Sequence, residues 1–239
     1  FDAPYTTICG ISKQEVAENF MPEIEAMGEE NGWTPEETLK QLTAFYDGYH
    51  FCRKNMVDIF NPFSLINALD DRELRNYWAS SGATSLLPKF VDDMEMKMEY
   101  FDHCFIERDT LETSDVVNGG AELFLYQSGY LTIKGYDDGV YILGFPNFEV
   151  RKALYSVVVP ALTMKSNSEV VSAQSFLRKM MQDGNTAEAK KALKALIADV
   201  PYSNKKMASM DMEERYRLIM STIFRACLLY TSPSPRDTR

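Results

Sequence analysis

Residues 11–31 carry apolar side chains at helical spacing behind a clear start signal. Ser12 followed by Glu15 has the form of a capping box, in which each side chain binds the other residue's backbone N–H. Behind it the apolar side chains recur every three or four positions: Val16, Phe20, Ile24 and Met27. Proline lacks a backbone N–H and clashes with the preceding turn, so Pro22 is predicted to kink this helix or to split it.

A second helix start lies at Thr34, with Pro35 at the first helical position and Glu37 at the third. The buried stripe of this helix is expected to contain Leu39, Leu42 and Phe45. Asp47-Gly48 is predicted to end the helix, because this pair adopts positive φ angles at little cost and reverses the chain.

An aromatic turn over 46–51 leads to a short extended segment at 57–60 and then to another helix. Asn61-Pro62 is predicted to start that helix, since asparagine caps free N–H groups and proline fits the first turn. Its apolar side chains expected to face inward are Phe63, Ile66 and Leu69. Further along, a helix is predicted around 84–91, whereas residues 92–120 are acidic and show no clear period.

The clearest pattern of the chain follows, with a short helix predicted over 121–127 and an alternating strand over 130–134. Asp137-Asp138-Gly139 reads as a hairpin turn, after which 140–145 forms the return strand. A helix capped by Asn147 comes next, with four apolar residues on one face: Val150, Leu154, Val157 and Ala161. Helix, hairpin and helix in this order are the plan of a winged-helix domain.

Three further helices are predicted, over about 169–182, 186–198 and 211–226, with Gly184 ending the first of them. The start signals of the other two are Asn185 with Glu188 and Asp211 with Glu214. The predicted fold is therefore mainly α (α+β). A helical bundle or lid is followed by a winged-helix-like domain with one β-hairpin, and then by further helices.

Charge divides the chain into two modules. The 239 residues carry a net charge of −10, and 45% of them are hydrophobic, which is usual for a globular protein. Residues 1–145 hold 10 Lys/Arg against 26 Asp/Glu, whereas residues 146–209 hold 10 against 5. The acidic module should repel nucleic acid, whereas residues 146–209 could contact phosphates, although solvated helix faces explain most of their lysines. No apolar run is long enough to span a bilayer, and no membrane partner is expected.

Few side chains suggest a metal or redox site. The four cysteines lie far apart and form no CxxC pair: Cys9, Cys52, Cys104 and Cys227. Neither a disulfide framework nor a zinc site is expected, and reduced thiols fit a cytoplasmic location. His50 and His103 are expected to be packed or surface side chains. Acidic pairs such as Asp70-Asp71 are expected to be solvated helix ends rather than sites for divalent ions.

Both ends of the sequence suggest a longer reading frame. Phe1 is not a start methionine, and the first residues lack the pattern of a signal peptide, so the chain is expected to begin inside a larger protein. Residues 227–239 resemble one reading frame of a transposase adaptor used in DNA library preparation. We expect this tail to lie outside the fold, and a genuine Pro-rich disordered tail is the alternative.

Six short strings, taken in order, carry a resemblance to a known family. They are Cys9-Gly10-Ile11-Ser12 with Glu15-Val16; Phe45-Tyr46-Asp47-Gly48-Tyr49-His50-Phe51; Phe60-Asn61-Pro62-Phe63-Ser64-Leu65; Tyr77-Trp78 with Ser81-Gly82; Gln127-Ser128-Gly129-Tyr130-Leu131-Thr132-Ile133; and Phe145-Pro146-Asn147 with Glu149-Val150. Over roughly residues 5–225 the chain resembles bacterial AAA-ATPase-like proteins that carry a C-terminal PD-(D/E)XK nuclease-like domain. Each string alone is weak, and their order makes the resemblance fairly specific.

The resemblance implies a division of the chain. Residues 1–65 would be the C-terminal end of the ATPase-like domain, and 66–120 a helical connection. Residues 121–200 would be the winged-helix-like region with its helices, and 201–226 the start of the nuclease-like domain. The family's ATP-binding motifs lie upstream of this stretch, and neither GxxxxGK[ST] nor GxGxxG occurs in it. No cofactor is therefore expected in this chain, whereas ATP and Mg²⁺ are implied for the full-length parent.

The resemblance implies structural rather than catalytic roles for the residues of the six strings. Eleven of them are expected to be structural: Tyr46, Asp47, Gly48, Tyr49, Asn61, Pro62, Ser128, Gly129, Tyr130, Pro146 and Asn147. Glu214 is a weak candidate for an acidic residue of the nuclease core, and it serves equally well as a helix-capping side chain.

Three functional hypotheses follow. The first is a non-catalytic coupling or lid segment that works with the rest of its parent chain and is inactive alone. The second is a winged-helix module that binds nucleic acid or a protein. The third is a purely structural helical domain. A basic face on the helix before the hairpin would favour the second.

Overall fold

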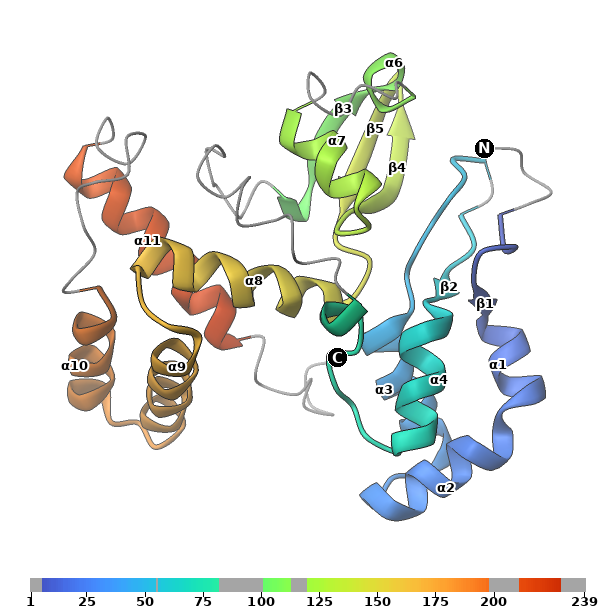
Figure 1. Cartoon of the computed structure of the whole chain (residues 1–239), viewed down its shortest axis with the longest axis horizontal. Helices are drawn as coiled ribbons and strands as arrows, with labels where there is room; N and C mark the ends of the chain where they lie inside the picture. The colour runs from blue at the N-terminus through green and yellow to red at the C-terminus, as the bar shows by residue number, and fades with distance from the viewer. Residues whose placement is uncertain (1–5, 55, 82–100, 113–119, 198–210, 229–239) are drawn as a thin grey trace. The chain divides into compact units, whose positions relative to one another are not determined.

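A computed structural model describes residues 6–54, 56–81, 101–112, 120–197 and 211–228. These residues are mainly helical and carry two small antiparallel sheets, as the mainly α (α+β) prediction requires (Figure 1). The described residues up to 153 form one compact unit, and those from 154 onward form a second. The division lies near the change from acidic to basic composition at 145–146.

The predicted first helix is split, as Pro22 requires. Helix α1 (Lys13–Asn19) begins with the Ser12–Glu15 capping box, and helix α2 (Met21–Asn31) has the proline in its first turn. Phe20 lies between them as the C-cap of α1 and the N-cap of α2. Gly32 ends α2 at a φ of 71°, a conformation that glycine adopts without strain.

Helix α3 (Pro35–Tyr46) begins at the predicted Thr34–Glu37 capping box and ends at Asp47. It packs with α2 around the core of the first unit. The buried members of that core are Val16, Ile24, Met27, Leu42, Phe45, Tyr46, Phe60, Leu65, Ala68, Leu69 and Tyr77. Leu39 packs against this cluster and is only partly buried.

Helix α4 (Pro62–Asp71) starts at Asn61 as predicted, but it presents a different face to the core. Phe63 and Ile66 were expected to face inward, and each is 49% exposed. The buried stripe is instead Leu65, Ala68 and Leu69, at the i, i+3, i+4 spacing of a helix. The prediction was right for Leu69 and wrong for Phe63 and Ile66, because it favoured the larger side chains, whereas the packed face contains the small Ala68.

Strands β1 (Ile11–Ser12) and β2 (Ile59–Phe60) form an antiparallel pair beside these helices (Figure 1). Ile59 also makes a bridge with Tyr49, so the aromatic turn lies along the other edge of β2. The extended segment predicted at 57–60 is therefore real but shorter.

The second sheet contains a strand that the sequence pattern did not reveal. Strand β3 (Cys104–Glu107) pairs with β5 (Val140–Gly144), which pairs in turn with β4 (Thr132–Asp137). The sheet order is β3-β5-β4, so the predicted hairpin is part of a three-stranded sheet. Four residues of alternating burial are too few to stand out within the acidic stretch 92–120.

The hairpin turn has the predicted form, with φ angles of 42° at Asp138 and 84° at Gly139. The one-turn helix α6 (Arg108–Leu111) and helix α7 (Gly120–Gln127) come between β3 and the hairpin in sequence, and α7 packs against β3 (Figure 1). Helix α8 (Phe148–Thr163) follows β5. The Asn147 side chain caps it, accepting the Val150 N–H at 3.0 Å.

The second unit contains the three predicted helices: α9 (Asn167–Gln182), α10 (Thr186–Ile197) and α11 (Met212–Leu228). Helix α9 packs against both of the others. Gly184 follows the end of α9 and has a φ of 69°. The Asn185 side chain accepts the Glu188 N–H at 3.2 Å, which is the predicted start of α10. Local signals therefore set these boundaries.

Helix α11 runs two residues beyond the expected end at 226, and its Cys227 is buried. The expectation that every residue from 227 onward lies outside the fold is thus wrong for the first of them. The helix predicted at 84–91 and the rest of the tail lie outside the described residues. Among the described helices, none has both the length and the apolar character needed to cross a membrane.

The face assigned to α4 can be tested by truncating two neighbouring side chains. We expect Leu65→Ala to lower the free energy of unfolding by about 2–5 kcal/mol, because Leu65 is fully buried. Ile66→Ala should lower it by less than about 1 kcal/mol, since half of that side chain is already in water. Urea denaturation measures both, and equal effects would contradict the assignment.

Candidate functional site

The strings that carried the resemblance come together in the first unit. The turn at 46–51 lies against 129–134 at the start of the hairpin, although about 80 residues separate the two segments in sequence. The Tyr49 hydroxyl donates to the Gly129 carbonyl at 3.3 Å. We call this contact between 46–51 and 129–134, together with Pro146, the joint.

His50 and Thr132 exchange two hydrogen bonds at the centre of the joint. The His50 backbone N–H donates to Thr132 Oγ1 at 2.8 Å, and the same hydroxyl donates to the His50 carbonyl at 3.0 Å. Both residues are buried. The threonine hydroxyl therefore satisfies both backbone groups of His50, which would otherwise be costly to bury.

The His50 ring links the hairpin to a carboxylate. Its Nδ1 lies 2.8 Å from the Ile133 carbonyl oxygen, and its Nε2 lies 2.8 Å from Asp58 Oδ1. A carbonyl and a carboxylate only accept, so the ring satisfies both when each nitrogen carries a proton. The ring is buried, whereas Asp58 is 60% exposed. His50 is thus a packed side chain, as expected, but one with defined partners.

Lys134 and Gly48 close the joint on the side of Pro146. The Lys134 ammonium donates to the Gly48 carbonyl at 3.2 Å and to the Pro146 carbonyl at 3.5 Å, and burial lowers the pKa of this lysine. Gly48 has a φ of 95°, and a Cβ placed there would lie 2.3 Å from the Pro146 carbonyl oxygen. Only glycine fits this position, because of both its backbone angle and the contact.

Two carboxyl groups of this region are buried. Burial raises the pKa of Asp47 to about 6, although Asp47 Oδ1 accepts the Gly48 N–H at 2.8 Å. Burial likewise raises the pKa of Glu149 to about 7, and the Trp78 N–H, which donates to Glu149 Oε1 at 2.8 Å, opposes that rise. Desolvation is the largest cause in both cases.

The other predicted structural residues hold single elements together. Asn61 Oδ1 accepts the N–H groups of Phe63 and Ser64 at 3.0 and 3.4 Å, and Pro62 occupies the first turn of α4. The Ser128 hydroxyl donates to the Phe124 carbonyl at 2.6 Å. These contacts are typical of helix ends and need no further role.

Two buried tyrosines complete this set. The Tyr46 hydroxyl donates to the Arg75 carbonyl at 2.9 Å and accepts the Arg75 N–H at 3.0 Å. The Tyr130 ring meets the edge of Trp78, with ring centroids 4.7 Å apart and planes at 84°. Each tyrosine fixes a neighbouring segment, which supports the structural interpretation of the resemblance residues.

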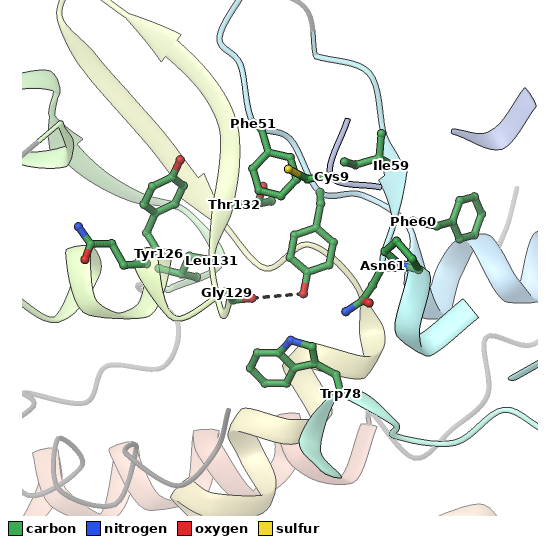
Figure 2. Close-up of a pocket in the computed structure, with 13 residues that line it drawn as sticks. Cys9, Phe51, Ile59, Phe60, Asn61, Trp78, Tyr126, Gly129, Leu131 and Thr132 are labelled. Atoms are coloured by element: carbon green, nitrogen blue, oxygen red, sulfur yellow. Dashed lines mark hydrogen bonds between the residues drawn. The ribbon is translucent and has the colours of Figure 1, made fainter. Parts of the chain in front are cut away.

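A cavity of about 520 Å³ lies beside the joint (Figure 2). Segments from both sides of the joint line it: Cys9, Tyr49, Phe51, Ile59, Phe60, Asn61, Pro62, Trp78, Tyr126, Gln127, Gly129, Leu131 and Thr132. Four of the predicted structural residues are thus also cavity residues, namely Tyr49, Asn61, Pro62 and Gly129. Five of the thirteen lining residues are aromatic.

Glu214 does not join this site. It belongs to the second unit and lies exposed in the first turn of α11, where its N–H donates to Asp211 Oδ1 at 2.7 Å. Helix capping therefore describes its surroundings. Among the described residues, no group of three or more His, Cys, Asp or Glu side chains could hold a metal ion. All four cysteines are free thiols.

Sequence reasoning missed the partners that complete the joint. Lys134 and Asp58 were read only as the end of a strand and as part of an extended segment. Glu149 was noted as part of a string, but its burial was not expected. The sequence signal for these partners was a charged residue within each apolar stretch. Exposed positions often carry such residues too, so this signal does not identify a buried partner.

Comparisons with known proteins give one relative. The chain is similar to an uncharacterized protein in the vnfD 5' region of Azotobacter chroococcum mcd 1, with 24% identity over 180 residues. The match covers 71% of this chain, and the chain spans 32% of the length of that relative. No family model matches the chain, and no solved structure does.

The fit of Gly48 against Pro146 can be separated from simple backbone strain. We expect Gly48→Ala to cost about 2–4 kcal/mol of unfolding free energy, because the methyl group meets the Pro146 carbonyl at a positive φ. Gly32→Ala has a similar φ of 71° and no atom within 4 Å, so it should cost only about 1–2 kcal/mol. Equal losses in denaturant titrations would show that the contact is unimportant.

Burial of Glu149 predicts a pH dependence of stability. Its folded pKa of about 7 lies above the ordinary value of 4.5, so the folded state binds more protons between these values and loses stability as pH rises through them. Glu149→Gln keeps an oxygen for the Trp78 N–H and removes the charge. As the pH rises from about 5 to about 8, the free energy of unfolding should fall in both proteins. We expect the fall to be about 1–3 kcal/mol smaller in this variant than in wild type.

Thermal or urea unfolding across this pH range measures the difference. Asp47, whose pKa is also raised, leaves a residual slope of the same sign in both proteins. Glu122→Gln is the control, because that carboxylate is only half-buried. Parallel pH profiles for wild type and Glu149→Gln would contradict the prediction.

Proposed function

We propose that this chain is the non-catalytic coupling or lid segment of a bacterial AAA-ATPase-like protein that also carries a PD-(D/E)XK nuclease-like domain. The parent would bind ATP through groups outside this chain. The observation that carries the proposal is the joint, because three of the six strings that resemble the family, at 45–51, 127–133 and 145–150, contact one another there.

The contacts of the joint suit a coupling role. Most of them connect a side chain of one segment to the backbone of the other, as between Thr132 and His50 or Lys134 and Gly48. A shift of the 46–51 turn would therefore move the backbone of β4 directly, without relying on flexible side-chain pairs. Buried hydrogen bonds of this kind favour one defined arrangement of two elements over many similar ones.

The parent's chemistry would lie elsewhere in its chain. In an ATPase-like domain, backbone amides, a lysine and Mg²⁺ would hold the nucleotide, and in a nuclease-like domain carboxylate-held metal would activate water. The relative from Azotobacter chroococcum is about three times as long as the matched stretch, which leaves room for such domains. The ATP-binding and nuclease activities of the whole protein remain part of the proposal.

The winged-helix alternative finds weaker support. Helix α7, which precedes the hairpin, contains no lysine or arginine, and its one charged residue is Glu122. The hairpin tip adds Asp137 and Asp138. Both elements would repel phosphates, so nucleic-acid binding would have to use basic residues elsewhere, such as the exposed Lys190, Lys191 and Lys194 of α10. A protein partner for this region stays an alternative.

The coupling role can be tested in the full-length protein expressed from its complete gene. We expect Thr132→Val to keep ATP binding but to reduce any ATP-dependent change in protease sensitivity or nuclease activity at least about tenfold, since losing two hydrogen bonds costs about 1–3 kcal/mol. Thr132→Ser retains the hydroxyl and should behave like wild type. Fluorescent-nucleotide binding and limited proteolysis with and without ATP are the two measurements.

Three results would argue against the proposal. Robust ATP turnover by this chain alone would place catalysis inside it. A Thr132→Val protein that responds to ATP like wild type would remove the joint from the coupling. A gel shift of nucleic acid by this chain that weakens steeply with added salt would favour the alternative instead.

A further inference from the structure

We propose that the cavity beside the joint binds a small, uncharged aromatic molecule. The proposal rests on the lining of the cavity and does not depend on the coupling role. The cavity volume of about 520 Å³ lies within the range of small-molecule sites, which is about 300–1,000 Å³.

The walls favour an aromatic ring. Figure 2 shows Phe51, Trp78 and Tyr126 approaching the cavity from different sides. Tyr49 adds a fourth ring that is nearly parallel to Phe51, with an angle of 8° between the planes. Aromatic side chains on several sides offer both stacked and edge-to-face contacts to a planar ligand, which an aliphatic ring of the same size cannot make equally well.

The lining also selects against charge. None of the thirteen lining residues is Lys, Arg, Asp, Glu or His. Two charged groups of the first unit that could serve a ligand are already engaged, since His50 pairs with Asp58 and Glu149 accepts the Trp78 backbone N–H. A phosphate or carboxylate placed inside would therefore lose its hydration without gaining a counter-charge. The cavity fits a neutral molecule and excludes an anionic one.

Several polar atoms of the lining are already hydrogen-bonded within the protein, so the lining can offer a ligand fewer hydrogen bonds. Thr132 exchanges both of its hydrogen bonds with His50, and Asn61 Oδ1 accepts two N–H groups of α4. The Gly129 carbonyl accepts from Tyr49 and keeps a second lone pair. A ring substituent with an N–H donor, such as a carboxamide, can donate to that lone pair. Benzamide is therefore a suitable probe.

Cys9 provides a direct report on occupancy. It lines the cavity and its side chain is exposed, whereas Cys52, Cys104 and Cys227 are buried. Alkylation of the native protein should therefore occur mainly at Cys9. A ligand in the cavity would slow that reaction by covering the thiol.

The experiment titrates this chain with benzamide at neutral pH and follows both ligand-observed saturation-transfer NMR and the rate of Cys9 alkylation. We expect a Kd of about 1 mM, as suits a ligand of this size, and a matching protection of Cys9. Benzoate has nearly the same shape and carries a charge, so it should bind at least about tenfold more weakly. Cyclohexanecarboxamide keeps the amide but lacks the aromatic ring, and it should bind about threefold to tenfold more weakly.

Two variants link binding to the cavity. Cys9→Phe places a bulky side chain at an exposed position of the cavity lining and should abolish the saturation-transfer signal. Ile8→Phe is the matched control, because Ile8 is 73% exposed and does not line the cavity, and it should leave the signal unchanged. Circular dichroism verifies that both variants fold.

Several outcomes would overturn the inference. Equal binding of benzamide and benzoate would show that the lining does not select by charge. Equal binding of benzamide and cyclohexanecarboxamide would remove the aromatic preference. Undiminished benzamide binding to a folded Cys9→Phe, or no binding to wild type at about 10 mM, would place the site elsewhere or remove it.

Discussion

The reciprocal hydrogen bonds between His50 and Thr132 hold the first unit together. They connect the segment after α3 to the first residue of β4, and they do so in a buried position where neither partner has water as an alternative. The His50 ring, Lys134 and the Gly48–Pro146 contact are arranged around this pair. Each of these contacts forms only when the backbones of 46–51 and 129–134 are as close as the His50–Thr132 hydrogen bonds hold them.

Buried charge is the cost of this arrangement. Asp47 and Glu149 lie almost out of contact with water, and desolvation raises the pKa of both carboxyl groups. Both accept backbone N–H groups, from Gly48 and Trp78, so each carboxylate orients a chain segment as well as occupying the interior. Burying a carboxylate is unfavourable for stability, and the orientation it enforces is a sufficient structural reason to keep it there.

The cavity follows from the same geometry. The segments 46–51 and 129–134 are held together mainly by side-chain hydrogen bonds to backbone groups. The aromatic side chains beside them do not fill the remaining space, which forms the cavity. The charged partners face one another within the joint, while the cavity keeps rings and neutral polar groups. The coupling role and the ligand site are separate proposals, but a molecule in the cavity would contact both segments and would therefore stabilise the joint.

The sequence alone determined the elements whose signals are local. Capping residues set the starts of α1, α3, α4, α10 and α11, Pro22 split the first helix, and Asp138-Gly139 formed the hairpin turn. These signals act over three or four residues, so a pattern in the chain is enough to find them. The charge change near 145 likewise indicated two modules.

The tertiary structure decided which faces are buried and which segments meet. The buried face of α4 depends on the core that it packs against, and β3 exists as a strand because β5 lies beside it. The joint depends on hydrogen bonds between residues 82 and 83 positions apart, such as His50 with Thr132 and Ile133. A local pattern predicts hydrogen bonds within a turn of helix, whereas contacts over such separations exist only once the chain has folded and excluded water from them.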